Sequence, residues 1–398
     1  MRRLIQRFLS PDITMNSPHR IDHISSCNIV ILHITAALGG GVVNSIAQLV
    51  QAQSADGMSV TVAHSIRSET PKEEDLQKLF PAPAKRIVLP MVTSVSPLND
   101  FRGLIAIIRL IKLLQPDIVH LHSSKAGVLG RIASWLMNLE SRTFYSPRGF
   151  SFLRLDVTNV TRQMYIASEK IASLFGGTLI ACSASEAQCA IDYLAGKKVV
   201  LVENCVDTAA VLTAQPLQTD RVRVVTSGRI CYQKAPWRFR QLATSCDSPN
   251  VDFVWIGDGE LLQHLQVSGL MPVNLMVTGW MHRSQVFEEI ARSDIFLLSS
   301  LWEGMPLSLI EAQVAGLPAV VSDVVGCRDV VKDGVTGFVC RSDDELAARL
   351  KQLIDDPALR HKMGRAAREI GLERFSIARM HREMMSVYGL SDRSGSVC

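Results

Sequence analysis

Short apolar segments alternate with longer amphipathic segments along this chain, and this alternation constrains the fold more than any other feature. The apolar segments are rich in Val, Ile and Leu and end in small or polar residues, as buried strands followed by loops do. Strands that alternate with helices favour a parallel sheet covered by helices on both faces. The predicted strands form two series, the first at 27–35, 59–66, 85–91, 117–124, 141–149, 176–187 and 197–207, and the second at 222–230, 251–259, 274–280, 293–300, 318–323 and 337–340. The sequence therefore predicts an α/β protein with two doubly wound halves.

The two series of strands predict two domains. Residues 208–221 become polar towards their end and contain a proline, so we predict a linker there, between a first domain at 27–207 and a second at 222–375. Residues 1–26 are predicted to be an N-terminal tail, and residues 376–398 a helix that packs back on the first domain, followed by a tail. Doubly wound sheets bind ligands at the carboxyl ends of their strands. A cleft between two such domains is therefore the expected site.

The composition excludes several classes of protein. Hydrophobic residues make up 47% of the chain and charged residues 20%, which argues for a large core and against disorder. The net charge of +4 is too small to indicate nucleic-acid binding, although residues 1–200 carry 21 basic and 14 acidic residues. A basic first half favours an anionic lipid surface or an acidic ligand, with an ordinary solvated surface as the alternative.

No part of the sequence is typical of a membrane span or an export signal. The chain has no uninterrupted run of about 18 apolar residues. The short apolar stretch near the N-terminus is interrupted by Arg7, Pro11 and Asp12, which argues against a signal peptide, and Met15 is an alternative start. The nine cysteines are scattered without a C-x-x-C pair, so neither a zinc site nor a disulfide framework is predicted. A reducing cytoplasm is the expected compartment.

Residues 299–323 contain the most informative motif. A predicted strand is followed by a loop with Glu303 and Gly304, and Pro306 suits the first position of the next helix because a missing N–H costs nothing there. Glu311 lies about a turn and a half into this helix. The free N–H groups of the first helical turn make an anion site. Gly304 would let a ligand approach the backbone closely.

A nucleoside-diphosphate sugar would fit this arrangement. A carboxylate repels a diphosphate, so Glu303 would accept hydrogen bonds from sugar hydroxyls, and Glu311 from a ribose. Arg229 and Lys234, at the end of the strand at 222–230, would neutralise the diphosphate. Each charge-assisted hydrogen bond is worth roughly 1.5–3 kcal/mol, against about 0.3–1 kcal/mol for a helix terminus, so the cations should contribute more. The spacing alone favours the alternative, two solvated surface acids.

Several motifs together resemble one family. Glu303 and Glu311 match an E-x7-E signature, and Gly228, Arg229 and Lys234 match a G-R-x(4)-K pattern. The matching context lies at 119–133, 145–152, 257–260, 278–280 and 333–339. Over roughly residues 28–390 the chain resembles the retaining GT-B glycosyltransferases of family four, of the polysaccharide-assembly type.

The resemblance implies two Rossmann-like domains facing each other across a cleft, and transfer of a sugar from a UDP- or GDP-sugar with its anomeric configuration retained. The implied acceptor is a lipid-linked saccharide in O-antigen, capsule or exopolysaccharide biosynthesis. The implied place is the cytoplasm, with peripheral attachment to the inner membrane face left open. The alternatives are a nucleotide-sugar-binding protein without transfer activity and a GT-B-type epimerase.

The resemblance also implies roles for single residues, with no cofactor and no metal. Glu303, Arg229 and Lys234 would be catalytic, with Glu303 on the sugar and the two cations on the departing diphosphate. The implied donor-binding residues are Gly228, Gly304, Met305, Pro306, Glu311, Gly40, Gly41, Arg148 and Trp280.

Two features of the first half leave alternatives open. Gly39, Gly40 and Gly41 follow the first strand like the glycine loop that family members close over the donor phosphates, and a plain tight turn is the alternative. Arg148 stands where related sequences often have His, and arginine, unlike histidine, is no neutral acceptor. Arg148 would bind a phosphate or an acidic sugar, or else form a structural ion pair.

Histidines and polar residues at strand ends are further candidates. His120 and His122 alternate on one strand and share a face. A metal pair would need a third ligand, and none is near in sequence, so we expect satisfied core or rim histidines. Ser123 and Lys125, at the end of that strand, are better candidates for the cleft.

Three smaller signals complete the sequence analysis. The helix at 103–114 either rests on a membrane through its two cations or faces the core, and the core is favoured. Asn204 and Asp207 are expected to stabilise a turn between the domains. Asp258 and Glu260 resemble a metal-binding D-x-D motif only superficially, so no metal is expected there.

Overall fold

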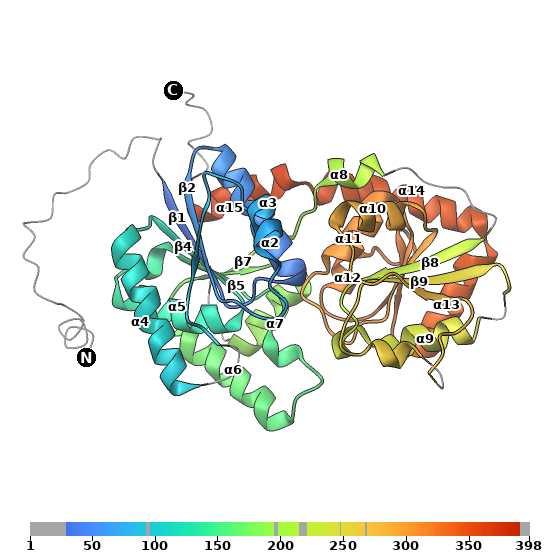
Figure 1. The fold of residues 1–398 in the computed structure, drawn as a ribbon, viewed down its shortest axis with the longest axis horizontal. Coiled ribbons are helices and arrows are strands. Elements are labelled where there is room, and N and C mark those ends of the chain that lie inside the picture. The colour runs from blue at the N-terminus through green and yellow to red at the C-terminus, as the bar shows by residue number, and fades with distance from the viewer. Residues whose placement is uncertain are drawn as a thin grey trace, which may run out of the picture.

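The computed structural model describes residues 29–92, 96–194, 198–214, 221–246, 248–266 and 269–390. Two parallel sheets, each covered by helices, lie side by side and form the two bodies of the molecule (Figure 1). The predicted fold class, two doubly wound domains, is therefore confirmed. Within the described ranges, no helix combines the length and the apolar character that crossing a membrane requires. The predicted N-terminal tail lies outside the described residues.

The first sheet has seven strands in the order β3-β2-β1-β4-β5-β6-β7, and all of its pairs are parallel. The chain reverses its direction across the sheet between β1 and β4, so the carboxyl ends of these two strands flank a switch point where ligands bind in such sheets. Its strands are β1 Val30–Thr35, β2 Ser59–His64, β3 Lys85–Val88, β4 Ile118–His122, β5 Thr143–Ser146, β6 Thr178–Ala181 and β7 Val199–Leu201.

Helices cover both faces of the first sheet because its strands are buried on both sides. The cluster that contains Leu32 and Ile34 packs against α4, α5, α6 and α7, whereas Ile31 faces the side of α2. The helical segments of this body are α2 Gly40–Ala55, α3 Glu73–Leu79, α4 Pro97–Leu114, α5 Ser124–Leu136, η1 Glu140–Arg142, η2 Ser151–Leu153, α6 Asn159–Ser173 and α7 Ala184–Leu194.

Helix α4 decides between the two interpretations of residues 103–114. Gly103, Ile107, Ile108 and Ile111 are buried and belong to or pack beside the core of the first sheet. These residues of α4 therefore face the core, as the favoured alternative predicted, whereas Leu98, Phe101 and Leu113 of the same helix are exposed.

The second sheet has six strands in the order β10-β9-β8-β11-β12-β13, again all parallel. One face packs on α10, α11 and α12, and the other on α9 and α13. Its strands are β8 Val222–Ser227, β9 Val251–Ile256, β10 Leu275–Val277, β11 Ile295–Leu298, β12 Ala319–Ser322 and β13 Gly337–Cys340. Its helical segments are η3 Tyr232–Lys234, α9 Pro236–Thr244, η4 Leu262–Leu265, α10 Arg283–Ala291, α11 Leu307–Ala315, α12 Cys327–Val330, α13 Asp343–Asp355 and α14 Pro357–Arg374.

The segment at 208–221, where we predict a linker, contains regular structure. It begins with a helix, α8 Thr208–Thr213, because the Asp207 carboxylate caps it by accepting a hydrogen bond from the Ala210 N–H at 3.0 Å. Val211 of this helix is buried in the core of the second body. Residues 215–220 lie outside the described residues.

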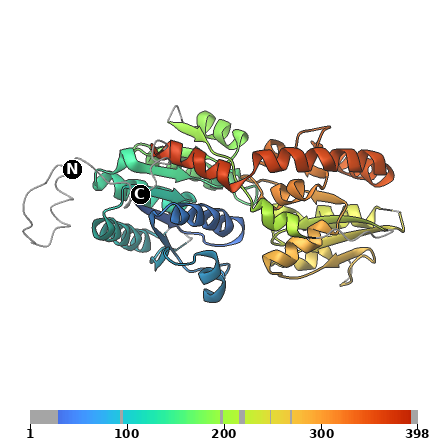
Figure 2. The same ribbon diagram turned by 90° about the horizontal axis from the view of Figure 1, so that it is seen from above.

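The chain returns to the first body at its C-terminal end. Figure 2 shows the two last helices, drawn in red, lying one over each body. Helix α15 Ile377–Tyr388 places Met380, Met384 and Tyr388 in a cluster with Ile31 of β1. The N–H of Val206 donates to the Phe375 carbonyl at 3.0 Å, so the two crossings of the chain run side by side. Residues 391–398 lie outside the described residues.

Candidate active site

The loop between β11 and α11 places Glu303 at the end of the second sheet. Glu303 is only 6% exposed although it lies in a loop. Pro306 is the N-cap of α11 and not its first residue, so the helix begins one residue later than predicted, at Leu307. The helix ends at Gly316, whose φ of 91° is the left-handed conformation that glycine adopts most readily.

Lys234 forms an ion pair with Glu303. The Lys234 Nζ donates to Glu303 Oε1 at 2.7 Å, and the Ser300 hydroxyl donates to the same oxygen at 2.8 Å. Gln233 Nε2 donates to the other oxygen at 3.1 Å. Burial acts to lower the pKa of Lys234, but the Glu303 carboxylate raises it above its usual value. The ammonium therefore stays protonated, and the two residues that the sequence assigned to separate parts of a ligand lie together.

Gly228 makes room for the Lys234 side chain. Its φ of 145° is a conformation that favours glycine, and a Cβ there would lie 3.2 Å from Lys234 Cε. Ala235, directly after Lys234, has a positive φ of 50°, and Pro236 then starts α9. The backbone is therefore bent on both sides of the loop that presents Lys234, a form of local strain that is common at functional sites.

Glu311 lies in α11 and is paired with a cation that the sequence analysis missed. Arg283 Nη2, at the start of α10, donates to Glu311 Oε1 at 2.6 Å. Burial raises the pKa of the Glu311 carboxyl, and Arg283 opposes this rise. Trp280 lies three residues before Arg283 and is 67% exposed, with its ring edge-on to His282. The position of Arg283 just after the T-G-W turn, which is part of the family resemblance, was the signal for it in the sequence.

Arg229 lies nearer to solvent than expected. Its side chain is 56% exposed and its Nε donates to Glu260 Oε2 at 2.9 Å, which raises the pKa of Arg229. Asp258 accepts a hydrogen bond from the Gly259 N–H at 2.7 Å. The two acids of the G-D-G-E turn are therefore engaged with a cation and with the backbone.

Two glycines mark where the bodies touch. A Cβ at Gly304 would lie 2.6 Å from the Gly149 nitrogen, so only glycine permits this approach. A Cβ at Gly41 would make an ordinary contact, 3.8 Å, with Leu307 of α11. Helix α2 begins at Gly40, so only Gly39 of the predicted glycine loop precedes the helix. The glycine triplet therefore presents the N-terminal end of α2 to the second body.

Arg148 connects the two bodies through Asn204. Its Nη1 donates to Asn204 Oδ1 at 3.0 Å and also to the Ser45 hydroxyl. Asn204 Nδ2 in turn donates to the Met305 carbonyl at 2.9 Å, so its role is a bridge between the bodies and not the turn that we predicted. Arg148 Nε donates to His122 Nδ1 at 3.3 Å, so the hydrogen-bond partners of Arg148 among the described residues are neutral side chains. The Arg148 backbone has a positive φ of 57°. Burial of the guanidinium lowers the pKa of Arg148.

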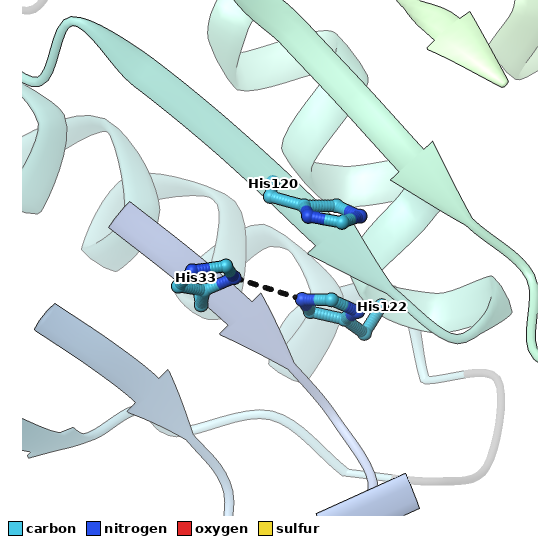
Figure 3. A group of neighbouring side chains, drawn as sticks. All are labelled: His33, His120 and His122. Carbon is cyan, nitrogen blue, oxygen red and sulfur yellow. Dashed lines mark hydrogen bonds between the residues drawn. The ribbon is translucent and has the colours of Figure 1, made fainter. Parts of the chain in front are cut away.

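Three histidines lie beside Arg148 in the first sheet. His120 and His122 of β4 meet His33 of β1, which is paired in register with His120 (Figure 3). His33 Nδ1 and His122 Nε2 are 3.0 Å apart, and Arg148 Nε donates to His122 Nδ1 at 3.3 Å. All three rings are fully buried, and burial lowers the pKa of His33 to about 4. The sequence analysis missed His33, which is far from the other two along the chain.

The partners of the histidines favour a core role over metal binding. Nitrogen atoms of the three rings lie within 4.8 Å of one another, close enough in principle for a shared ion. His33 Nε2 is hydrogen-bonded to Gln53 Oε1 at 2.8 Å. His120 is hydrogen-bonded through Nδ1 to the Tyr388 hydroxyl at 2.6 Å and through Nε2 to the Ser146 hydroxyl at 2.9 Å. The adjacent guanidinium of Arg148 opposes a further cation. We therefore interpret the cluster as the satisfied core histidines that the sequence predicted.

The other strand-end candidates have separate roles. Lys125 Nζ donates to Asp100 Oδ1 at 2.6 Å, so its charge is balanced within the first body. Ser123 has a φ of 67° and a ψ of 157°, a conformation that is rare outside glycine, and its hydroxyl has no hydrogen-bond partner. Ser123 therefore stays a candidate for the cleft.

Comparison with known proteins identifies the family. A model described as Glycosyltransferase Family 4 matches residues 39–210, and one described as Glycosyl transferases group 1 matches residues 212–370. A UDP-Gal:α-D-GlcNAc-diphosphoundecaprenol α-1,3-galactosyltransferase of Escherichia coli is 31% identical over 288 residues, which is 67% of this chain and 73% of that protein. The chain belongs to glycosyltransferase family 4. The resemblance inferred from the sequence motifs is thereby confirmed.

Further similarities agree with this membership. An O-antigen biosynthesis glycosyltransferase of Escherichia coli, WbnH, is 25% identical to this glycosyltransferase over 272 residues, 67% of this chain and 75% of that protein. The solved structure of Anabaena Alr3699/HepE in complex with UDP-glucose superposes with a TM-score of 0.74 at 18% identity, covering 91% of this chain and 99% of that one. The structural similarity shows that this glycosyltransferase and Alr3699/HepE share a fold.

Most of the expected residues lie where the two bodies of this glycosyltransferase meet, and they form its candidate site. Glu303, Lys234 and Gly228 form one group, and Arg148 and Gly304 bring the first body against it. Glu311 of α11 lies to the side, paired with Arg283 of α10, and Arg229 lies near solvent. Sequence reasoning missed four residues that contact candidate residues through their side chains, namely Ser300 and Gln233 on Glu303, Arg283 on Glu311, and His33 on His122.

Proposed function

We propose that this glycosyltransferase moves a sugar from a nucleoside-diphosphate sugar to a lipid-linked saccharide, with retention of the anomeric configuration, in the assembly of a surface polysaccharide. The observation that carries the proposal is the Glu303–Lys234 pair beside the N-terminal end of α11. An acid that accepts sugar hydroxyls, a protonated amine and free helical N–H groups are what a sugar diphosphate requires.

The proposed step breaks the bond between the anomeric carbon and the diphosphate oxygen. A new bond forms to the acceptor hydroxyl on the same face of the sugar, and the hydroxyl proton passes to the departing diphosphate. Lys234, Arg229 and the N-terminal end of α11 would stabilise the negative charge that develops on the leaving group. Glu303 would hold the sugar hydroxyls, and Glu311 the ribose. No metal and no cofactor is needed for these roles.

A uridine nucleotide is the donor that the comparisons favour. The name of the Escherichia coli galactosyltransferase includes UDP-Gal, and Alr3699/HepE was solved in complex with UDP-glucose. A GDP-sugar fits the same diphosphate groups, so the base has to be decided by binding. Trp280, exposed beside the start of α10, would stack on the base in either case.

An apolar stripe on α6 supports a lipid-linked acceptor. Val160, Met164, Ile171 and Leu174 are between 58% and 72% exposed, and their spacing places them on one face of the helix. Exposed apolar stripes of this kind mark contact with a membrane or another apolar surface. We therefore assign peripheral attachment at the inner membrane face to α6, whose exposed apolar residues share one face.

A thermal-shift series with UDP, GDP, ADP and their sugars tests the donor class. We expect UDP and UDP-sugars to raise the melting temperature most. Transfer is then measured from the preferred UDP-sugar to a short-chain lipid diphosphate that carries GlcNAc, with the anomeric configuration of the product read by NMR. An inverted product, or a stronger response to GDP, would contradict the corresponding part of the proposal.

The same assay separates the alternative functions. Tight binding of UDP-sugar without turnover on any acceptor would favour a binding protein, for which Arg148 in place of histidine is the motivating observation. Conversion of the UDP-sugar in the absence of an acceptor would favour an epimerase.

A further inference from the structure

A cavity of about 410 Å³ lies at the carboxyl ends of β11, β12 and β13. It is bordered by the start of α13 and by Arg238 of α9, and Leu155 of the first body lines one wall. We propose that this cavity binds one uncharged sugar unit of the acceptor glycan, beside the donor sugar. This inference rests on the proposed function, since it names the acceptor part of the same site.

The floor of the cavity contains a hydroxyl that lacks a partner. Ser322, the last residue of β12, is 5% exposed, and its Oγ has no hydrogen-bond partner. A buried hydroxyl without a partner is unfavourable, and most such groups in proteins find one. Cys340 and Leu346 supply apolar surface beside it. A sugar offers both hydroxyls and apolar C–H faces, so it would satisfy Ser322 and cover the apolar floor.

The rim of the cavity decides the charge of the ligand. Arg238 and Arg341 line the cavity together with three carboxylates, those of Asp323, Asp343 and Asp344. Arg328, beside this lining, pairs its Nε with Asp323 Oδ1 at 2.8 Å. Arg238 Nε lies 3.1 Å from Asp343 Oδ1, and Arg341 Nε lies 3.8 Å from Asp323 Oδ2. Three acids oppose a phosphate, and two guanidinium groups oppose a cation. Alternating donors and acceptors suit the hydroxyls of a neutral saccharide.

The position of the cavity beside the candidate donor site indicates that the saccharide bound there belongs to the acceptor. Ser300 lines the cavity, and its hydroxyl donates to Glu303 Oε1 at 2.8 Å, so the cavity begins one side chain away from the residue that would hold the donor sugar. Leu155 lies in the connection that leads to α6, whose exposed apolar stripe begins at Val160. A lipid held at α6 and a sugar held in the cavity would therefore lie along one path.

The test compares a cavity variant with a matched control. Ser322→Ala combined with Asp344→Ala removes one hydroxyl and one carboxylate from the cavity, and Asp355→Ala removes a carboxylate at the other end of α13. The acceptor probe is GlcNAc diphosphate on a short alkyl chain, used with the UDP-sugar that the wild-type protein prefers. We expect the cavity variant to raise the acceptor KM about tenfold or more, as the loss of two hydrogen bonds implies. The donor KM should change less than about twofold, and Asp355→Ala should change neither constant.

A binding measurement keeps the inference independent of turnover. In the presence of UDP, saturation-transfer NMR should detect methyl N-acetyl-α-glucosaminide on the wild-type protein and on Asp355→Ala, and the signal should be lost in the cavity variant. A UDP thermal shift equal to that of the wild type shows that the variant is folded. A protein that shows this NMR signal but no transfer contradicts the proposed function and leaves the cavity assignment standing.

Two outcomes would overturn the inference. A raised donor KM with an unchanged acceptor KM would mean that the cavity holds part of the donor sugar. Unchanged constants together with an unchanged NMR signal would mean that the cavity holds only solvent.

Discussion

At the residue scale, Glu303 and Lys234 form one ion pair, and we expect substitution of either residue alone to impair sugar transfer. Lys234→Ala removes a cation from the leaving group, and Glu303→Ala removes the acceptor of the sugar hydroxyls, so each should lower kcat/KM by about 10²–10³, as the loss of a preorganised charge typically does. Steady-state kinetics with the preferred UDP-sugar measures this. Arg221→Ala, which breaks an exposed pair with Asp252, is the control and should leave the kinetics unchanged.

The same substitution of Lys234 has a cost in stability. Glu303 would remain buried with only Ser300 and Gln233 as donors. Breaking a buried pair is strongly destabilising, and because two donors remain we expect a loss on the order of 2 kcal/mol in the free energy of unfolding. Urea denaturation measures it, and an unchanged midpoint would show that the pair is not formed in solution.

The buried histidines predict a pH dependence at the same scale. His33 has a pKa of about 4 in the folded protein and near 6.5 when unfolded, so between these values the unfolded chain binds more protons. The free energy of unfolding should therefore fall as the pH drops from 6.5 to 4, by roughly 3 kcal/mol for His33 alone. His33→Gln should flatten this dependence, whereas the exposed His361→Gln should not. Denaturation at pH 7, 6 and 5 checks the slopes.

At the element scale, the exposed stripe of α6 gives the next prediction. Met164→Glu with Ile171→Glu places two charges on a face that contacts no other part of the described core, so the fold should survive. Sedimentation with anionic vesicles should show binding reduced about tenfold, because each charge is opposed by the apolar interface and by the anionic lipid. Leu270→Glu, equally exposed on the second body, is the control. Equal loss in the control would mean that net charge, and not α6, controls the binding.

At the scale of the whole molecule, Asn204 holds the two bodies together through Met305. Asn204→Asp keeps an acceptor for Arg148 but removes the donor to the Met305 carbonyl, so the bodies should separate more easily while each stays folded. We expect a larger radius of gyration in small-angle scattering with UDP bound, and a transfer rate lowered about tenfold. A radius equal to that of the wild type would show that the bridge does not control closure.

Much of the architecture followed from the sequence because the signals are local. Val- and Ile-rich segments predict buried strands, and the turn from strand to helix around Glu303 is readable from Gly304, Pro306 and Gly316. Where helices begin at other residues than predicted, the cause is local as well. Asp207 caps a helix where polar composition predicted a linker, and α2 begins inside the glycine triplet.

What the sequence determined by itself was the pair of parallel sheets and the loops that carry the candidate residues, since periodicity, turn residues and helix caps act between near neighbours. Only the tertiary structure decided which side chains meet: Lys234 with Glu303, Arg283 with Glu311, and Asn204 with Met305, which is 101 positions away. The physical reason is that a hydrogen bond requires a donor–acceptor distance set to within a few tenths of an ångström and a suitable angle at the hydrogen. Sheet order and the packing of one body on the other set those distances, and no local pattern encodes them.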